Sequence, residues 1–241
     1  MLNTNDLDEN EALTAKQLEW LQKDMESSKA QWKFVALHKA PYSHGSHYKD
    51  DDVCNIREQL QNLMPALGID MVFQGHDHVY MRTGSLVNNA NTAYDRTYLN
   101  HNGEVYRTQI QPTGTTYVIS GTSGVKTYLT NDLGATDKYF PRGEKMLAVD
   151  APMFSSIEIE DGVLYFTSYA VFSDRIEVED RFAIQKDLTQ GDVAEGYTEP
   201  PVEEEKENKV LDTVKKIVEV LAKVVIVMLN IYKLYFMNPA K

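Results

Sequence analysis

Residues Met71–Thr83 read MVFQGHDHVYMRT, and the predictions for the rest of the chain follow from this segment. It begins with three apolar residues, and Gly75 then precedes two histidines, His76 and His78, which one aspartate separates. A short apolar run bounded by a glycine is typical of a buried strand that ends in a turn. In extended chain the two imidazoles would point the same way, whereas a turn led by glycine lets each face a different metal ion. The spacing therefore suits a dinuclear metal centre, and the alternative is an ordinary pair of surface histidines.

A second apolar run, upstream of the first, favours the metal centre. Residues Trp32–His38 form it, and Pro41 keeps the strand from continuing past the histidine. A helix expected at residues 53–67 separates the two strands, as in the parallel sheets of α/β proteins. Open sheets of this kind place their sites at the carboxyl ends of the strands. We therefore expect His38 to converge with the two histidines of the first segment at one edge of a sheet.

Two short motifs in these segments resemble those of a known family. Val35–His38 matches the block V-x-x-H, Gly75–His78 matches the block G-H-x-H, and a Tyr-x-Arg tail follows at Tyr80–Arg82. In this order and with these strand contexts, the chain resembles the calcineurin-like metallophosphoesterases, and most of all their purple acid phosphatase branch, over residues 13–184. The resemblance implies an α/β fold: the C-terminal half of a four-layer α/β/β/α sandwich, followed here by a separate C-terminal helix.

The resemblance also implies a chemistry for the three histidines. By their positions in the motifs, His38 and His76 would bind the second metal of a dinuclear centre, and His78 would bind the first. Imidazole suits iron, zinc, manganese and nickel alike, so the sequence does not identify the two metals. The substrate would be a phosphate ester, and an extracellular or cell-surface location would fit the family, although no signal peptide begins at Met1. Asp77 would support the loop rather than bridge the ions.

Three further blocks of the family, D-x-[HG], G-D-x-x-[DY] and G-N-H-[DE], have no match in this chain, and the 37 residues before His38 are too few to hold them. By resemblance these blocks carry the bridging aspartate and the group that acts on the leaving oxygen, so the catalytic residues are expected in a missing N-terminal part. Two ions without a bridging carboxylate would repel each other unscreened. One hypothesis is therefore a fragment of a phosphoesterase that is inactive alone and has its missing N-terminal half as a partner. The other is an inactive remnant or an interaction module that assembles through the C-terminal helix.

Polar loops near the motifs supply candidates for substrate binding. His44 and His47 lie in the loop between the first strand and the expected helix, where either would be placed to contact substrate phosphate. The alternative is a solvated loop with ordinary imidazoles. The segment Gly121–Gly124 has the G-x-x-G pattern of a phosphate cradle, but no helix pattern or lysine follows it, which favours a tight turn.

Other patterns predict the surrounding elements. A capping box at Thr14–Gln17 begins a helix whose apolar face contains Leu18, Leu21 and Met25. Residues 84–112 are rich in Asn, Thr, Tyr and Gly, which predicts a long insertion of irregular loops with a hairpin at Asn102–Gly103. Residues 154–184 alternate about a turn at Asp161–Gly162, which predicts a β-meander similar to the last strands of the family's second sheet.

Composition and charge complete the prediction. Hydrophobic residues make up 42% of the chain and charged residues 25%, enough for a substantial core, while the net charge of −12 argues against nucleic acid as a partner. We assign residues 1–187 to the metallophosphoesterase part, 188–208 to an acidic linker and 209–237 to an amphipathic helix with a heptad seam. We expect this helix to dock onto a protein surface or to self-associate, and the alternatives are interfacial membrane attachment and a membrane span.

Overall fold

A mixed sheet of parallel and antiparallel strands carries the two apolar runs that end in histidines. The structure is a computed structural model, which describes residues 1–124, 126–127, 143–187 and 191–198. The strands of this first sheet lie in the order β1-β2-β7-β3-β4, with β8 paired to β3. Strands β1, β2 and β7 run parallel to one another, and β3 returns antiparallel to β7. The bounds are β1 Phe34–Ala36, β2 Met71–Gln74, β3 Tyr80–Val87, β4 Ala90–Asn91, β7 Thr115–Ser120 and β8 Lys145–Leu147.

The second sheet is mostly antiparallel. Its strands lie in the order β12-β5-β6-β11-β10-β9, and only the β6–β11 pair is parallel among the described pairings. The predicted meander is confirmed, since β9, β10 and β11 are adjacent antiparallel strands. The bounds are β5 Asp95–His101, β6 Glu104–Ile110, β9 Met153–Glu160, β10 Val163–Val171, β11 Ile176–Gln185 and β12 Asp192–Val193.

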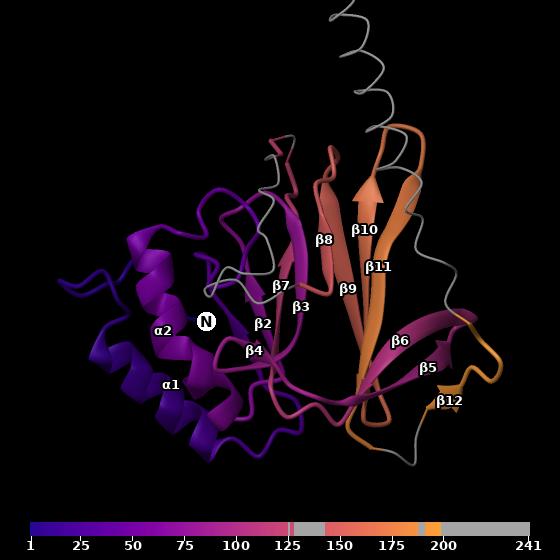
Figure 1. Ribbon diagram of the computed structural model, residues 1–241, viewed down its shortest axis with the longest axis horizontal. Coiled ribbons are helices and arrows are strands. Elements are labelled where there is room, and N and C mark those ends of the chain that lie inside the picture. The colour runs from indigo at the N-terminus through magenta and orange to yellow at the C-terminus, as the bar shows by residue number, and fades with distance from the viewer. Residues whose placement is uncertain (125, 128–142, 188–190, 199–241) are drawn as a thin grey trace, which may run out of the picture. The chain divides into compact units, whose positions relative to one another are not determined.

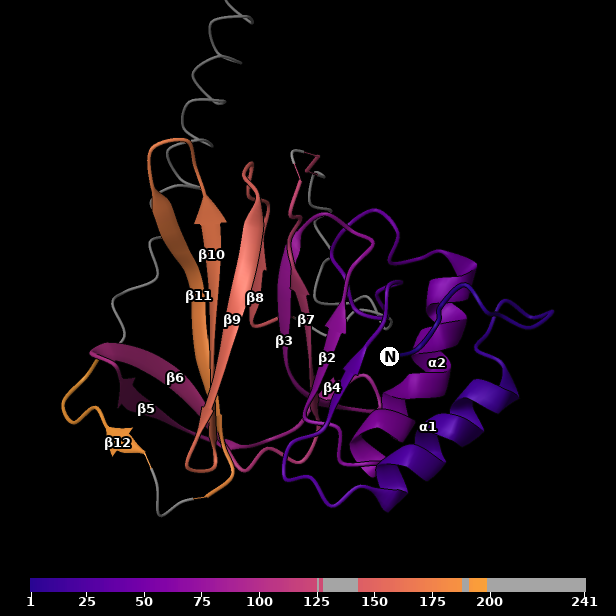
Figure 2. The same ribbon diagram turned by 180° about the vertical axis from the view of Figure 1, so that it is seen from behind.

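The described elements form three layers, with helices on one face of the first sheet and the second sheet on its other face (Figures 1 and 2). The helices are α1 (Ala15–Ser27) and α2 (Asp51–Ala66). Successive side chains of a strand point to opposite faces, so β1, β2, β3 and β7 each contribute to two cores. In β2, for example, Val72 packs with the helices, whereas Met71 and Phe73 pack against the second sheet. This layered α/β architecture agrees with the fold class that the sequence predicts.

The turns follow the local rules, but one helix start does not. At both Asn102–Gly103 and Asp161–Gly162 the two central residues have positive φ, as two-residue hairpin turns require. Helix α1 has Thr14 at its N-cap and the predicted apolar face, yet the Thr14 side chain makes no capping hydrogen bond. The Gln17 side chain instead accepts the Asn3 N–H (2.8 Å) and donates to the Asn3 and Asp6 carbonyls. The predicted capping box is therefore wrong, because Gln17 holds the N-terminal segment.

Residues 84–112 correct a second expectation. Instead of irregular loops they complete β3 and form β4, β5 and β6. The expectation is wrong because Thr and Tyr are good strand residues, and a strand with one solvated face is as polar in composition as a loop. Only the hairpin at Asn102–Gly103 was predicted correctly.

A buried ion pair joins the two sheets. Arg82 of β3 donates from Nε to Asp180 Oδ2 of β11 (2.6 Å) and from Nη1 to Glu144 Oε2 (2.8 Å). The Tyr80 hydroxyl also donates to Asp180 Oδ2, at 2.7 Å. Burial raises the pKa of Asp180, but the facing guanidinium outweighs it and holds the pKa below its usual range.

Residues beyond the second sheet are described only in part. Strand β12 pairs with β5 within the range assigned to the acidic linker. The predicted helix at 209–237 lies outside the described residues and stays a prediction. Neither α1 nor α2, the helices that the structure describes, is long and apolar enough to cross a membrane.

Candidate metal centre

His38 and His76 meet at the carboxyl ends of two neighbouring parallel strands. His38 follows β1 and His76 follows β2, and the Gly75 N–H donates to the His38 carbonyl at 3.0 Å. His76 Nδ1 lies 3.2 Å from His38 Nε2. Two nitrogens bound to one tetrahedral ion, at bond lengths of 2.0–2.1 Å, lie about 3.3 Å apart. The pair is thus spaced as two ligands of a single ion would be.

The turn between His76 and His78 separates the two imidazoles, for a reason that the sequence did not reveal. His76 itself adopts φ 70°, whereas Gly75 is not among the residues with positive φ. A residue other than glycine in this region is uncommon and indicates a backbone held by its surroundings. His78 Nδ1 donates to the Lys126 carbonyl at 2.6 Å, so its ring lies against a different segment. The two imidazoles thus contact different segments, and the left-handed residue of the turn is the histidine and not the glycine.

The loop before α2 brings a third imidazole to the pair. The ring centroids of His47 and His76 lie 4.4 Å apart, and His47 Nδ1 lies 2.8 Å from Asp50 Oδ2. One possible ligand atom from each of His47, Asp50 and His76 lies within 4.8 Å of the others. Sequence reasoning considered His47 for substrate binding but missed Asp50. The sequence feature that could have indicated Asp50 is its position three residues after His47, in a loop that leaves the carboxyl edge of the sheet.

Asp77 ties this loop to the turn. Its side chain is 1% exposed, accepts the Ser43 hydroxyl at Oδ2 (2.5 Å) and accepts the His47 N–H at Oδ1 (3.2 Å). A Cβ on Gly45 would lie 2.3 Å from Asp77 Cγ, so only glycine lets the loop approach this closely. The structure places Asp77 in a loop-supporting position and not between two imidazoles.

Two further side chains anchor the same loop from outside. The Gln74 side chain accepts the Tyr42 N–H (3.1 Å) and donates to the Tyr42 carbonyl (2.7 Å), which fixes the loop to the end of β2. Buried Arg57 of α2 donates to the Pro41 and Tyr48 carbonyls, both at 2.5 Å. Because charge-assisted bonds to a buried guanidinium are strong, the loop is held in one conformation.

His44 occupies a different place from His47. Its ring is 3% exposed, and Nε2 donates to the Tyr80 carbonyl at 2.9 Å, which attaches the loop to β3. Burial lowers the pKa of His44 despite the Tyr80 carbonyl and the Asp77 charge. The neutral ring acts in the structure as a buried hydrogen-bond donor, and the substrate contact considered for it stays a prediction.

The electrostatics of the cluster favour neutral imidazole at His76. Burial lowers its pKa first, and the nearby His47 and His38 rings lower it further. A neutral ring presents the lone pair that a metal needs. Imidazoles with one carboxylate suit the borderline ions, such as zinc, iron, manganese and nickel, so the donor set fits the implied metals. The group of His47, Asp50 and His76 is the one cluster of this kind in the part of the chain that the structure describes.

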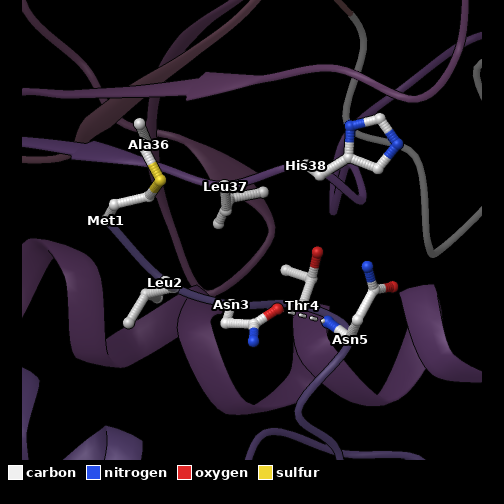
Figure 3. A pocket seen from close by; sticks show the side chains of 8 residues that line it. All are labelled: Met1, Leu2, Asn3, Thr4, Asn5, Ala36, Leu37 and His38. Atoms are coloured by element: carbon white, nitrogen blue, oxygen red, sulfur yellow. Dashed lines mark hydrogen bonds between the residues drawn. The ribbon is translucent and has the colours of Figure 1, made fainter.

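A cavity of about 430 Å³ lies beside His38, at the first strand of the sheet order. Figure 3 shows Met1–Asn5 lying along Ala36–His38, with the Leu37 side chain between the two segments. The Leu2 N–H donates to the Ala36 carbonyl at 2.9 Å, so the N-terminal segment lies against β1. The cavity therefore adjoins one imidazole of the His38–His76 pair.

Parts of this chain are similar to known proteins in sequence and in fold. Residues 2–80 match the family model for calcineurin-like phosphoesterases. Purple acid phosphatase 15 of Arabidopsis thaliana is 28% identical over 115 residues, which cover 46% of this chain and 18% of that protein. The solved structure of purple acid phosphatase PPD1 from yellow lupin (Lupinus luteus) seeds superposes with a TM-score of 0.56 at 21% identity, over 73% of this chain and 29% of that one. The chain therefore spans less than a third of the length of either relative.

Proposed function

We propose that this chain, a homologue of the calcineurin-like phosphoesterases and of purple acid phosphatases in particular, contributes to the hydrolysis of a phosphate ester at a dinuclear metal centre. The observation that carries the proposal is the 3.2 Å approach of His38 Nε2 to His76 Nδ1 at the ends of adjacent parallel strands. In this proposal those two histidines hold one ion, and His78 contributes to the other.

The residues of this chain act by holding and positioning. When bound, the two ions would supply Lewis-acid polarisation of the phosphate and a water of lowered pKa. His38 and His76 are anchored by the strand ends, and the Lys126 carbonyl fixes the His78 proton on Nδ1. Loops that leave such strands place their side chains over the site, and His47 extends from one of them beside His76.

The described residues do not supply every ligand that two ions need. Two neighbouring cations require an anionic bridge, and Asp77 is engaged with Ser43 and His47. By the resemblance, the bridging carboxylate and the group that assists the leaving oxygen belong to the three blocks that have no match in this sequence, and we propose that a segment outside these 241 residues supplies them. Such a segment would have to add its ligands next to His38, beside the β1 edge and its cavity.

The test compares two proteins with p-nitrophenyl phosphate as the substrate. The first is the 241-residue chain, for which we expect no metal-dependent hydrolysis. The second is the same chain extended by the coding sequence immediately upstream in frame, where we expect the three missing blocks and metal-dependent turnover. His76→Ala should abolish that turnover, since it removes a ligand. If the 241-residue chain hydrolyses the substrate and His76→Ala abolishes this, the chain is not an inactive fragment. If the extended protein is inactive, the proposed phosphoesterase function is wrong.

An interaction module is the second candidate, and one surface favours it. On the solvent side of the second sheet, Phe154 stacks on Tyr169 with ring centroids 4.9 Å apart, and Tyr169 pairs across β10 and β11 with Val178. Phe154 is 47% exposed, Val178 is 41% exposed and the nearby Ile176 is 61% exposed. Exposed apolar groups that adjoin one another often mark a contact between proteins. Light scattering of the parent chain and of Ile176→Lys tests self-association. A dimer that forms in the parent chain but not in the variant supports the interaction module. If the parent chain and the variant are both monomeric, this surface does not mediate self-association.

A further inference from the structure

We propose that Asp77 is a positioning residue, whose buried carboxylate holds the loop that carries His47 at a fixed distance from the turn that carries His76. The inference rests on the proposed function, in which His47 lies beside the phosphate ester, and it adds what keeps that side chain in place. The sequence indicated only that Asp77 supports a loop. The structure shows that its effect reaches a segment 30 residues away in the chain and shows through which atoms it does so.

The two oxygens of the Asp77 carboxylate hold two different points of the loop. Oδ1 accepts the His47 N–H at 3.2 Å, and Oδ2 accepts the Ser43 hydroxyl at 2.5 Å. The Ser43 hydroxyl oxygen in turn accepts the Gly45 N–H at 2.8 Å. One carboxylate therefore holds alternate residues of the segment from Ser43 to His47, either directly or through one hydroxyl.

The base of the loop is shielded from water, which strengthens these contacts. Asp77 and Ser43 are 1% and 0% exposed, so water does not compete for the carboxylate oxygens. Gly45 packs so closely that a Cβ there would lie 2.3 Å from Asp77 Cγ. Steric contact thus keeps the loop from moving toward the turn, and the hydrogen bonds keep it from moving away.

The His47 ring is oriented by another carboxylate, which does not set where the backbone lies. Asp50 Oδ2 lies 2.8 Å from His47 Nδ1, but the two side chains are 49% and 35% exposed, so water weakens this contact. The His47 and His76 ring centroids lie 4.4 Å apart. Because Asp77 directly follows His76 and binds the His47 N–H, it is the residue through which this separation is set.

Other anchors of the loop lead elsewhere in the fold. Gln74 binds the Tyr42 backbone at the end of β2, and His44 donates to the Tyr80 carbonyl in β3. These contacts fix the loop to strands of the sheet. The contact with Asp77 fixes it to the turn after β2, where two of the motif histidines lie.

The first experiment tests positioning in the metal-free 241-residue chain and requires no activity. NMR measures nuclear Overhauser effects between the His47 and His76 rings, whose centroids are 4.4 Å apart, and between the His38 and His76 rings, at 5.1 Å. Asp77→Ala should abolish the first effect and leave the second. Asp77→Asn should preserve both, because an amide oxygen can still accept the His47 N–H. Circular dichroism checks folding, and Asp77→Ser, too short to make both contacts, replaces an alanine variant that does not fold.

The second experiment tests the consequence in the extended protein of the proposed function. It measures the KM for p-nitrophenyl phosphate and the inhibition constant of inorganic phosphate. Asp77→Ala should raise both at least about tenfold, because a small displacement of a positioned group is costly, and Asp77→Asn should recover most of the loss. His47→Ala should raise both to a similar degree, and the double variant should raise them no further, since Asp77 acts through His47. The matched control is Asp51→Ala, which removes an exposed carboxylate from the first turn of α2 and should change neither constant by more than about twofold.

The outcomes separate this inference from the proposed function. The inference is overturned if Asp77→Ala keeps both ring contacts or loses both, or if it leaves the two constants of an active extended protein unchanged. Failure of Asp77→Asn to restore them also overturns it, because the charge and not the position would then matter. Additive effects in the double variant overturn it as well, because Asp77 would then act by another route. An inactive extended protein refutes the proposed function alone, and the NMR result still decides whether Asp77 positions His47.

Discussion

Asp180→Asn removes one charge from the ion pair that joins the two sheets. The side chains of Arg82 and Asp180 are 4% and 7% exposed, so neither charge is well solvated. Loss of one partner from a buried pair costs about 3–5 kcal/mol, because the remaining charge is left uncompensated. Glu144 still faces Arg82 at 2.8 Å, which places the expected loss in the free energy of unfolding at the lower end, about 3 kcal/mol. For a chain of this size the melting temperature should fall by about 6–12 °C.

Urea unfolding at neutral pH measures this loss, with tryptophan fluorescence as the signal. Trp32 packs against the core between the two sheets and reports its exposure, whereas Trp20 is already 48% exposed. The matched control is Glu177→Gln on the same strand, since the Arg175–Glu177 pair has side chains that are 51% and 45% exposed. Exposed pairs contribute about 0–1 kcal/mol, so the control should change stability little.

The reasoning fails if the two variants lose the same free energy of unfolding. In that case burial of the pair would contribute nothing beyond a surface contact, and apolar packing alone would hold the sheets together. The urea dependence of the unfolding free energy should stay the same in both variants, because a change in it would mean that the unfolded or native surface had altered.

Three further predictions concern acid and the loop that carries His47. Burial raises the folded-state pKa of Asp180, but Arg82 outweighs it and lowers this pKa, so the ionised carboxylate stabilises the fold above about pH 4 and stabilises it less as pH falls below that value. In urea unfolding between about pH 7 and pH 3, Asp180→Asn should therefore lose less free energy of unfolding on acidification than the parent chain does. An equal loss in both proteins would contradict this. Gly45→Ala places a Cβ 2.3 Å from Asp77 Cγ and should cost about 1–3 kcal/mol in thermal unfolding; an unchanged melting temperature would show that the loop yields freely. His44→Ala removes a buried ring and the donor to the Tyr80 carbonyl, so we expect the free energy of unfolding in urea to fall by about 2–4 kcal/mol. A fall below about 1 kcal/mol would mean that water replaces the donor.

Local patterns in the chain were sufficient for most of the elements. The apolar run at Met71–Phe73 predicted a strand, and β2 occupies Met71–Gln74. The turn at Asp161–Gly162 and the apolar face of α1 were also predicted correctly. These features depend on neighbours within a few residues, through the periods of strand and helix and through turn chemistry. The same local reasoning misjudged residues 84–112, because the solvated face of a sheet and a polar loop have similar compositions.

The sequence alone was enough to predict that His38 and His76 lie at one edge of a sheet, at the ends of two parallel strands. This prediction needs only the motifs and the helix between the two strands, which can be read along the chain. The place of Asp50 in the cluster, the left-handed backbone of His76 and the support from Asp77 depend on the folded chain. Asp77 contacts Ser43 and His47 across 34 and 30 residues, and such contacts follow from the packing of loops and not from any pattern along the chain. The side chains that complete a site are chosen by which segments meet at a strand end, and only the packed fold brings those segments together.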